Sequence, residues 1–366
     1  IYIHIPFCLS RCGYCSFYSL PFSKTAMQEY FGVLLREKQL YQGYLQGTLT
    51  SIYLGGGTPS LLSAGQILML LEGLIINSDT EITLEINPLQ ITCDYLSELA
   101  KTPVNRLSIG LQSMDDKQLA WLGRRHRADQ MEQKISWCRE FGYRNLSLDL
   151  IYGLPEAQCE IGLQENLQAF LSLKPQHLSC YLLSLEEDCA LAAEGPSLPG
   201  DDQLSLQYYT ICDTLSEAGL LQYEISNFSL PSHTAKHNLA YWKSSDYLAW
   251  GASAAGWIRP HRYQNPAGLK DYYHNVKASI LFPEAENCSL EQEQCDWLMM
   301  GLRLNEGIRS NDFVQRFNCD LPASFWAKAD QLERLGMLEL GSGKVALSKR
   351  ARFVSNSVIG ELIQCI

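Results

Sequence analysis

The sequence lacks both long apolar runs and long basic runs. Among its 366 residues, no stretch of about eighteen apolar residues passes without a charge, which excludes a membrane-spanning helix. We also expect no signal peptide before the first predicted strand. Lysine and arginine number 29 against 40 acidic residues, a formal net charge of -11. Because phosphate binding needs concentrated positive charge, we expect no nucleic acid among the partners.

The sequence also lacks the closely spaced cysteines of a disulfide-rich secreted domain. It has 13 cysteines, but beyond the first fifteen residues they are scattered singly, from Cys93 to Cys365. Such scatter is typical of proteins from a reducing compartment. We therefore expect a soluble, cytoplasmic protein. Because the chain begins with Ile rather than Met, we also expect further residues upstream of Ile1.

Three cysteines stand close together near the start of the chain. Cys8, Cys12 and Cys15 are spaced C-x3-C-x2-C, directly after the alternating apolar residues of a predicted strand. Three thiolates on one loop can hold three irons of a [4Fe-4S] cluster and leave the fourth iron open for chemistry. The alternatives are a zinc site, most simply completed by His4, and buried free thiols. The spacing and its flanks favour the cluster.

Short β-rich runs alternate with amphipathic helical stretches along the first half of the chain. The predicted strands cover residues 1–5, 51–54, 82–86, 106–109, 146–151 and 178–183. Six βα units imply a parallel sheet and suit an α/β fold in which a partial (βα)6 barrel leaves one side open. We expect this barrel over residues 1–199, and a cap or extension over residues 200–283.

Polar residues and glycines follow the predicted strands, at the ends that form one face of such a barrel. Glu85, Gln112 and Asp149 stand there, and buried carboxylates are unfavourable unless something pairs them. Gly55, Gly56 and Gly57 would expose bare backbone to a ligand, but no Gly-Lys-Ser/Thr follows, so they do not form a phosphate loop.

One ligand suits this set of groups. S-adenosylmethionine could place its amine on backbone carbonyls, its carboxylate on Arg124 and its ribose hydroxyls on Glu85 or Asp149. Its amino and carboxylate groups could also chelate the open iron. The aromatic ring of Tyr14, between the cysteines, could lie over the cluster edge or an adenine, or pack in the core.

The chain resembles radical S-adenosylmethionine proteins, and more narrowly the group that contains HemN, an oxygen-independent coproporphyrinogen III dehydrogenase, and HemW, a heme chaperone. The resemblance rests on YIHIPFC, YLGGGTPS, LEINP, RLSIGLQSMDD with LGRRH, LDLIYGLP, YEISNF and HNLAYW. It implies S-adenosylmethionine contacts from Tyr2, Gly56, Gly57, Thr58, Glu85, Gln112, Arg124 and Asp149. In HemN-like proteins, the position of Tyr14 helps to bind a second S-adenosylmethionine molecule.

The resemblance implies that an electron enters the cluster and cleaves S-adenosylmethionine to a 5′-deoxyadenosyl radical. In a HemN-type enzyme this radical starts the decarboxylation of propionate side chains of coproporphyrinogen III. Three features point instead to a heme carrier. Phe17 stands where HemN-type sequences have a fourth cysteine. The chain also has little sequence before the cysteine loop, where HemN has a substantial segment. The third feature is HNLAYW, which resembles the HNxxYW stretch of HemW.

The candidate heme ligand is His237, the histidine of HNLAYW, although a lone histidine is more often a hydrogen-bonded core residue. Ala255 replaces a histidine that relatives commonly have in the segment 251–256, so His233 and His261 are the reserve candidates.

The alternation of predicted strands and helices does not continue after Pro283. Helical stretches over 297–304, 310–317 and 323–335 are followed by a predicted hairpin of residues 336–340 and 345–348. We expect a winged-helix-like domain over residues 284–366. Because Lys328 and Arg334 are balanced by Asp330 and Glu333, protein docking or covering of the barrel is favoured over DNA binding.

The sequence therefore predicts a heme chaperone with a [4Fe-4S] cluster, S-adenosylmethionine and heme. We expect it to meet an electron donor and a heme acceptor protein, and the acceptor could be membrane-associated. The runner-up is a coproporphyrinogen III dehydrogenase, and a radical methyltransferase or heme-degrading relative is a third hypothesis.

Overall fold

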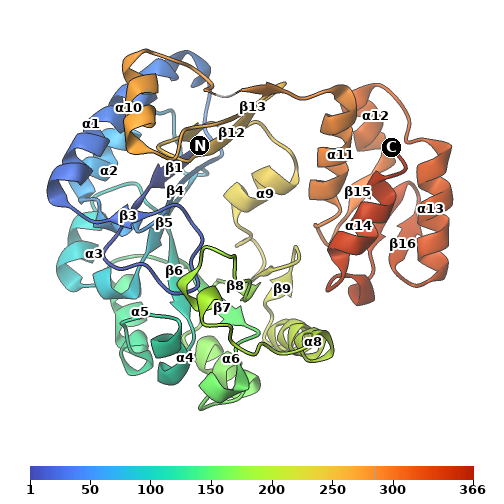
Figure 1. Ribbon diagram of the computed structural model, residues 1–366, viewed down its shortest axis with the longest axis horizontal. Coiled ribbons are helices and arrows are strands. Elements are labelled where there is room, and N and C mark those ends of the chain that lie inside the picture. The colour runs from blue at the N-terminus through green and yellow to red at the C-terminus, as the bar shows by residue number, and fades with distance from the viewer. Residues whose placement is uncertain (284) are drawn as a thin grey trace.

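A parallel sheet of six strands forms the centre of the computed structural model, which describes residues 1–283 and 285–366 (Figure 1). All six strands pair in chain order and run parallel. They are β1 (Tyr2–Ile5), β4 (Ser51–Gly56), β5 (Glu81–Ile86), β6 (Arg106–Gln112), β7 (Asn145–Tyr152) and β8 (His177–Leu182). The predicted partial barrel of six βα units is confirmed, with strand ends that differ from the expected ones by a few residues.

Helices cover the outer face of this sheet, as Figure 1 shows. They begin where the sequence offers caps: Ser63 forms a capping box with Gln66, and Asp115 accepts two backbone N–H groups. The helices of residues 1–283 are α1 (Lys24–Leu40), α2 (Ala64–Leu71), α3 (Cys93–Leu99), α4 (Asp116–Trp121), α5 (Met131–Glu140), α6 (Leu163–Ser172), α7 (Ala190–Ala193), α8 (Asp201–Glu217), α9 (Lys236–Trp242) and α10 (Leu269–Lys277).

Short strands that the sequence did not predict extend the sheet at both edges. Next to β1 lies β11 (Ala249–Trp250), which runs parallel to it. On the other side, β10 (Asn227–Ser229) and β9 (Leu221–Gln222) follow β8 in antiparallel pairs. Smaller sheets comprise β2 (Phe7–Cys8) with β3 (Leu20–Pro21), and β12 (Ala255–Ile258) with β13 (His261–Gln264) and β14 (Glu286–Asn287).

The segment of residues 200–283 packs into the same hydrophobic core as the barrel, through buried side chains such as Tyr208, Trp250 and Tyr272. A buried carboxylate on α1 helps to hold it. Glu37, which is 2% exposed, accepts hydrogen bonds from the N–H of Gly251 at 2.8 Å, from Asn265 at 2.6 Å and from the Tyr272 hydroxyl at 2.6 Å. Burial raises the pKa of Glu37 to about 7.

The C-terminal residues form a separate domain with its own core, around Trp297, Phe313 and Phe325. Its helices and three-stranded sheet match the expected winged-helix-like pattern, while α14 and β15 were not predicted. The elements are α11 (Leu290–Gly301), β15 (Ile308–Arg309), α12 (Ser310–Phe317), α13 (Ala323–Arg334), β16 (Leu338–Gly341), β17 (Lys344–Leu347) and α14 (Ser355–Ile363). The predicted boundary at residue 284 lies outside the described residues. No described helix is long and apolar enough to cross a bilayer.

Candidate cluster and cofactor site

A cavity of about 440 Å³ opens at the carboxyl ends of the parallel strands. Its lining joins the cysteine loop to most of the residues predicted from the strand ends. Predicted site residues among the lining are Cys8, Cys12, Cys15, Tyr14, Gly56, Gly57, Thr58, Glu85, Gln112, Arg124 and Asp149. Asn87, Tyr181 and Phe17 line it as well. Residues distant in sequence therefore meet at the barrel face where we expected them.

All three cysteines of the loop are free thiols. Among the described residues, no three His, Cys, Asp or Glu side chains converge closely enough to bind one metal ion. A single zinc ion would need such a group, whereas a cubane cluster holds its thiolates at separate corners. His4, the residue that could complete a zinc site, is engaged elsewhere: its Nδ1 contacts the Tyr2 hydroxyl at 2.9 Å and its Nε2 contacts the Tyr18 carbonyl at 3.2 Å.

Two of the thiols accept hydrogen bonds from the barrel. Thr58 Oγ1 donates to Cys8 Sγ at 3.5 Å, and Arg124 Nη1 donates to Cys12 Sγ at 3.4 Å. Hydrogen bonds to the sulfur ligands of an iron–sulfur cluster tune its reduction potential.

The glycines after β4 let the cysteine loop approach the sheet. A Cβ atom on Gly57 would lie 2.8 Å from the Phe7 carbonyl oxygen and 3.0 Å from Cys8 Sγ, so only glycine fits without moving the thiol. Gly56 has a φ of +114°, a conformation that other residues rarely adopt. The triple glycine therefore positions both the cysteine loop and the cavity wall.

Two carboxylates stand inside the barrel mouth. Glu85 accepts hydrogen bonds from the Tyr53 hydroxyl at 2.8 Å and from the N–H of Gly56 at 3.1 Å, yet burial raises its pKa to about 7. Burial also raises the pKa of Asp149, to about 6, although the nearby charge of Arg106 lowers it. Both side chains are suitable acceptors for ligand hydroxyl groups, and both titrate near neutral pH.

Gln112 and Arg124 complete the predicted set. Gln112 lies at a β-bulge between β6 and β7 and has a φ of 71°, a strained conformation of the kind that clusters at functional sites. Arg124 donates from Nη2 to the Gly110 carbonyl, which fixes its guanidinium beside Cys12. A carboxylate near the cluster would meet this cation.

Tyr2 is the one predicted S-adenosylmethionine contact that does not line the cavity. The ring of Tyr2 stacks on the ring of Tyr53, with centroids 6.2 Å apart. Tyr53 is itself part of the cavity lining. In this arrangement Tyr2 supports a lining residue.

His237 is buried on α9 with both ring nitrogens engaged. Its Nδ1 contacts Ser51 Oγ at 3.0 Å and its Nε2 contacts the Tyr241 hydroxyl at 2.8 Å, and only 2% of the residue is exposed. Its ring also stacks on Tyr53 at 5.1 Å. In this conformation neither nitrogen is free to bind a heme iron, so the arrangement favours the core role over the ligand role.

Arg106 and Asn238 are among the lining residues that the sequence did not predict. Arg106 opens β6 and is 2% exposed; it lines the cavity, and its Nε has no hydrogen-bond partner among the described residues. A charged residue at the start of a predicted buried strand was the available signal. Asn238 also lines the cavity, next to His237 in the HNLAYW segment.

The residues present fit a [4Fe-4S] cluster and S-adenosylmethionine. Three free thiols share one cavity, two of them accept hydrogen bonds, and two carboxylates and three guanidinium groups lie on the same lining. Cys8, Cys12 and Cys15 would hold the cluster, and Arg124, Glu85 and Asp149 would hold the charged and hydroxyl groups of the ligand. Together the two groups supply one-electron reductive cleavage of a sulfonium.

Comparisons with known proteins identify the family of this chain. Residues 2–161 match the radical SAM superfamily, and residues 296–354 match the HemN C-terminal domain. The heme chaperone HemW of Bacillus subtilis is 31% identical over 99% of this chain and 98% of its own. HemW of Lactococcus lactis is 30% identical over 99% and 96%, and HemW of Escherichia coli is 37% identical over 70% and 69%.

A solved structure shares the fold. Coproporphyrinogen III oxidase (HemN) from Escherichia coli superimposes with a TM-score of 0.83 over 100% of this chain and 88% of its own, at 22% identity.

Proposed function

This chain belongs to the HemW family of radical S-adenosylmethionine proteins, and we propose that it binds heme and hands it to an acceptor protein. The observation that carries the proposal is the extent of the similarity. Relatives named heme chaperones match 99% of the chain, through both the barrel and the C-terminal domain.

The residue at position 17, Phe17, favours the function of a heme carrier over that of a coproporphyrinogen III dehydrogenase. It is 70% exposed at the rim of the cofactor cavity, at the position where HemN-type sequences have a fourth cysteine. The likeness to HemN, at 22% identity, is a likeness of fold, and fold alone does not determine activity. Coproporphyrinogen III dehydrogenase activity is therefore the second candidate only.

A carrier of this kind would meet two proteins. An electron donor would approach the cavity rim near Phe17, and a heme acceptor would meet the C-terminal domain, which leaves Leu290 and Leu335 more than half exposed. All 13 cysteines are free, in keeping with a cytoplasmic location.

The test is anaerobic reconstitution of the full chain with cluster, S-adenosylmethionine and heme. We expect a stable heme spectrum, transfer of heme to an apo-acceptor, and no formation of protoporphyrinogen IX from coproporphyrinogen III. Turnover of coproporphyrinogen III at a useful rate without a stable heme spectrum would favour the dehydrogenase.

A further inference from the structure

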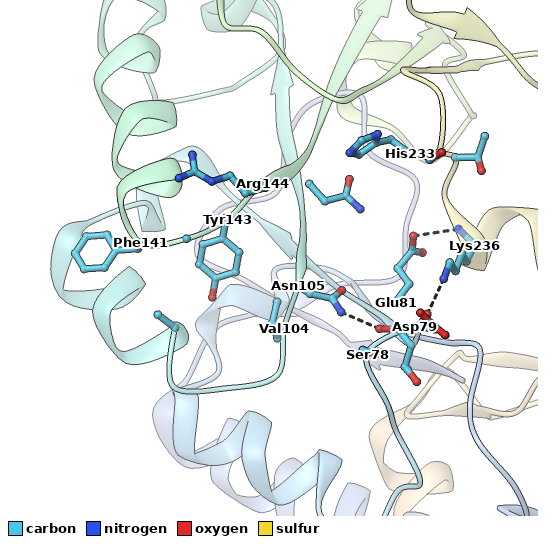
Figure 2. A pocket seen from close by; sticks show the side chains of 16 residues that line it. Ser78, Asp79, Glu81, Val104, Asn105, Phe141, Tyr143, Arg144, His233 and Lys236 are labelled. Carbon is cyan, nitrogen blue, oxygen red and sulfur yellow. Dashed lines mark hydrogen bonds between the residues drawn. The ribbon is translucent and has the colours of Figure 1, made fainter.

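A second cavity, of about 460 Å³, lies at the amino ends of β5 and β7, away from the cysteines (Figure 2). Two of its charged residues already have partners within the chain. Lys236 Nζ donates to the Asp79 carbonyl at 2.6 Å, and Glu81 accepts the N–H groups of Lys236 and His237 at 3.1 Å each. His233, a reserve candidate for heme ligation, lies in this lining, which is mostly polar and does not suit the apolar face of a porphyrin.

At the carboxyl end of the barrel, the connection between β8 and α8 contacts the cysteine loop. Residues 188–191 of this connection are called the strap below. The Cys189 thiol donates to the Tyr14 carbonyl at 3.1 Å, and the N–H of Leu191 donates to the Gly13 carbonyl at 2.9 Å. Both acceptors lie between the second and third cysteines, so the strap is bonded to the part of the loop that sets the spacing of two thiols.

The buried contacts of the strap matter more than its exposed one. Cys189 is 2% exposed and Leu191 is 4% exposed. Asp188 also pairs with Arg11 at 3.4 Å, but the two side chains are 64% and 47% exposed. Exposed ion pairs contribute little to stability, because water and salt screen them. Cys189 and Leu191 are therefore the residues that hold the loop.

The fit between the strap and the loop is closest at Gly13. A Cβ atom on Gly13 would lie 2.8 Å from Leu191 Cγ, and its three nearest atoms would all belong to Leu191. The φ of Gly13 lies outside the left-handed region, so its backbone conformation is open to other residues. The contact with Leu191 is what requires a glycine at this position.

The end of α4 holds the same residue through a second contact. The N–H of Gly13 donates to the Leu122 carbonyl at 3.2 Å, and a Cβ atom on Gly123 would lie 3.2 Å from the Gly13 nitrogen. Leu122 and Leu191 are both buried in a small hydrophobic cluster separate from the main core, and Tyr14 packs against this cluster. The loop is thus anchored to α4, to the strap and to the apolar cluster that both of them share.

We propose that the strap is a positioning element for the iron–sulfur cluster, in which Leu191 and Cys189 hold the backbone between Cys12 and Cys15 so that the thiols face the cluster. A loop that is ordered in advance retains its ligand better than one that the ligand must order. The same connection lines the cofactor cavity through Leu183 and Ser184. The inference concerns retention of the cluster and does not depend on heme.

The first test is the rate of iron release to a chelator from the anaerobically loaded full chain. Leu191→Ala should release iron about tenfold faster than the wild type, because truncation of a buried leucine leaves a gap beside Gly13. Cys189→Ala should also release iron faster, whereas Cys189→Ser keeps a donor for the Tyr14 carbonyl and should stay close to the wild type. Leu173→Ala is the matched control, since Leu173 is equally 4% exposed but belongs to the main core after α6.

The second test is a pair of compensating changes. Gly13→Ala should lower the iron content after reconstitution, because the new Cβ meets Leu191. In the Leu191→Ala background that obstacle is gone, so Gly13→Ala should cause no further loss. Far-ultraviolet circular dichroism confirms that each variant is folded. Additive losses in the double variant would overturn the role of this contact.

The third test needs no cluster. Trypsin cleaves after Arg11, which is exposed in the cysteine loop. In the cluster-free chain, Leu191→Ala should be cut at this bond faster than the wild type, and Leu173→Ala should be cut at the wild-type rate. If Leu191→Ala matches the wild type in both cleavage and iron release, the strap does not position the loop. If Leu173→Ala releases iron as fast as Leu191→Ala, the effect is general destabilisation and the proposal is wrong.

Discussion

The Tyr53 hydroxyl donates a 2.8 Å hydrogen bond to Oε1 of Glu85 at the mouth of the barrel. Together with the N–H of Gly56 on Oε2, it fixes the carboxylate toward the cofactor cavity. Burial nevertheless raises the pKa of Glu85 to about 7, so this positioned acceptor is only partly ionised near neutral pH.

Binding of S-adenosylmethionine should therefore strengthen with pH. Because the ionised carboxylate accepts hydroxyl groups and attracts a cationic ligand, affinity should rise as pH increases from 6 to 8. Below the pKa, one bound proton changes affinity by up to about tenfold per pH unit. Calorimetric titration of the cluster-loaded protein should show that Glu85→Gln binds S-adenosylmethionine more weakly and that its affinity depends less on pH. The pH dependence that remains, near pH 6, should come from Asp149. An unchanged slope in Glu85→Gln, relative to a control at exposed Glu98, would remove this residue from the site.

Cys12→Ala should abolish the cluster, because it removes one of three thiolates in the cavity. Iron content after anaerobic reconstitution should fall from about four per chain toward zero, and the charge-transfer absorbance of the cluster should disappear. The exposed Cys93 on α3 offers a matched control, since Cys93→Ala should retain full iron. Full iron content in Cys12→Ala would contradict the ligand assignment.

Gly57→Ala should lower cluster occupancy while leaving the fold intact. Its new Cβ would lie 2.8 Å from the Phe7 carbonyl and 3.0 Å from Cys8 Sγ, so the thiol must shift. Gly43→Ala meets no atom within 4 Å and should behave as wild type. Iron analysis alongside far-ultraviolet circular dichroism separates cluster loss from unfolding. Equal iron in the two variants would show that the loop tolerates the shift.

Glu37→Gln should change how stability depends on pH. The folded-state pKa of Glu37 is about 7 against a reference of 4.5, so the folded state binds more protons between these values. The contribution of Glu37 to the free energy of unfolding is fully present below pH 4.5 and is lost as the pH rises through 7. For a pKa shift of this size, the loss is about 3 kcal/mol.

Urea unfolding from pH 5 to 8 should therefore show the wild type losing stability relative to Glu37→Gln. Exposed Glu29 on the same helix provides the control, because Glu29→Gln should track the wild type at every pH. A constant difference between Glu37→Gln and the wild type would mean that Glu37 does not titrate in this range.

The sequence was most informative where a local pattern determines the structure. Alternating strands and amphipathic helices imply a parallel sheet, and the chemistry of Glu85, Gln112 and Asp149 then follows from their places at strand ends. The two-residue strands β9 and β11 were missed because they are too short to show a period. Burial of Arg106 was missed because it depends on curvature of the whole sheet.

The surroundings of the histidines also could not be predicted from local sequence. The HNLAYW pattern drew attention to His237, but the partners that occupy its ring nitrogens, Ser51 and Tyr241, include a residue from a strand far away in sequence. His233 has no distinctive neighbours in the sequence. The cavity that His233 lines exists only once the starts of β5 and β7 and the segment before α9 meet.

The pairing of β11 with β1 also has a consequence for biosynthesis. Ile3 of the first strand lies opposite Trp250, and the N–H of Tyr2 donates to the Leu248 carbonyl at 2.8 Å. At about 5 to 20 residues per second, a ribosome needs roughly 10 to 50 seconds to reach this segment. Throughout that interval the strand that leads into the cysteine loop has an open edge, which can pair with other chains. A nascent chain that stalls before residue 248 would therefore expose the iron-binding loop on a sheet still missing its outer neighbour.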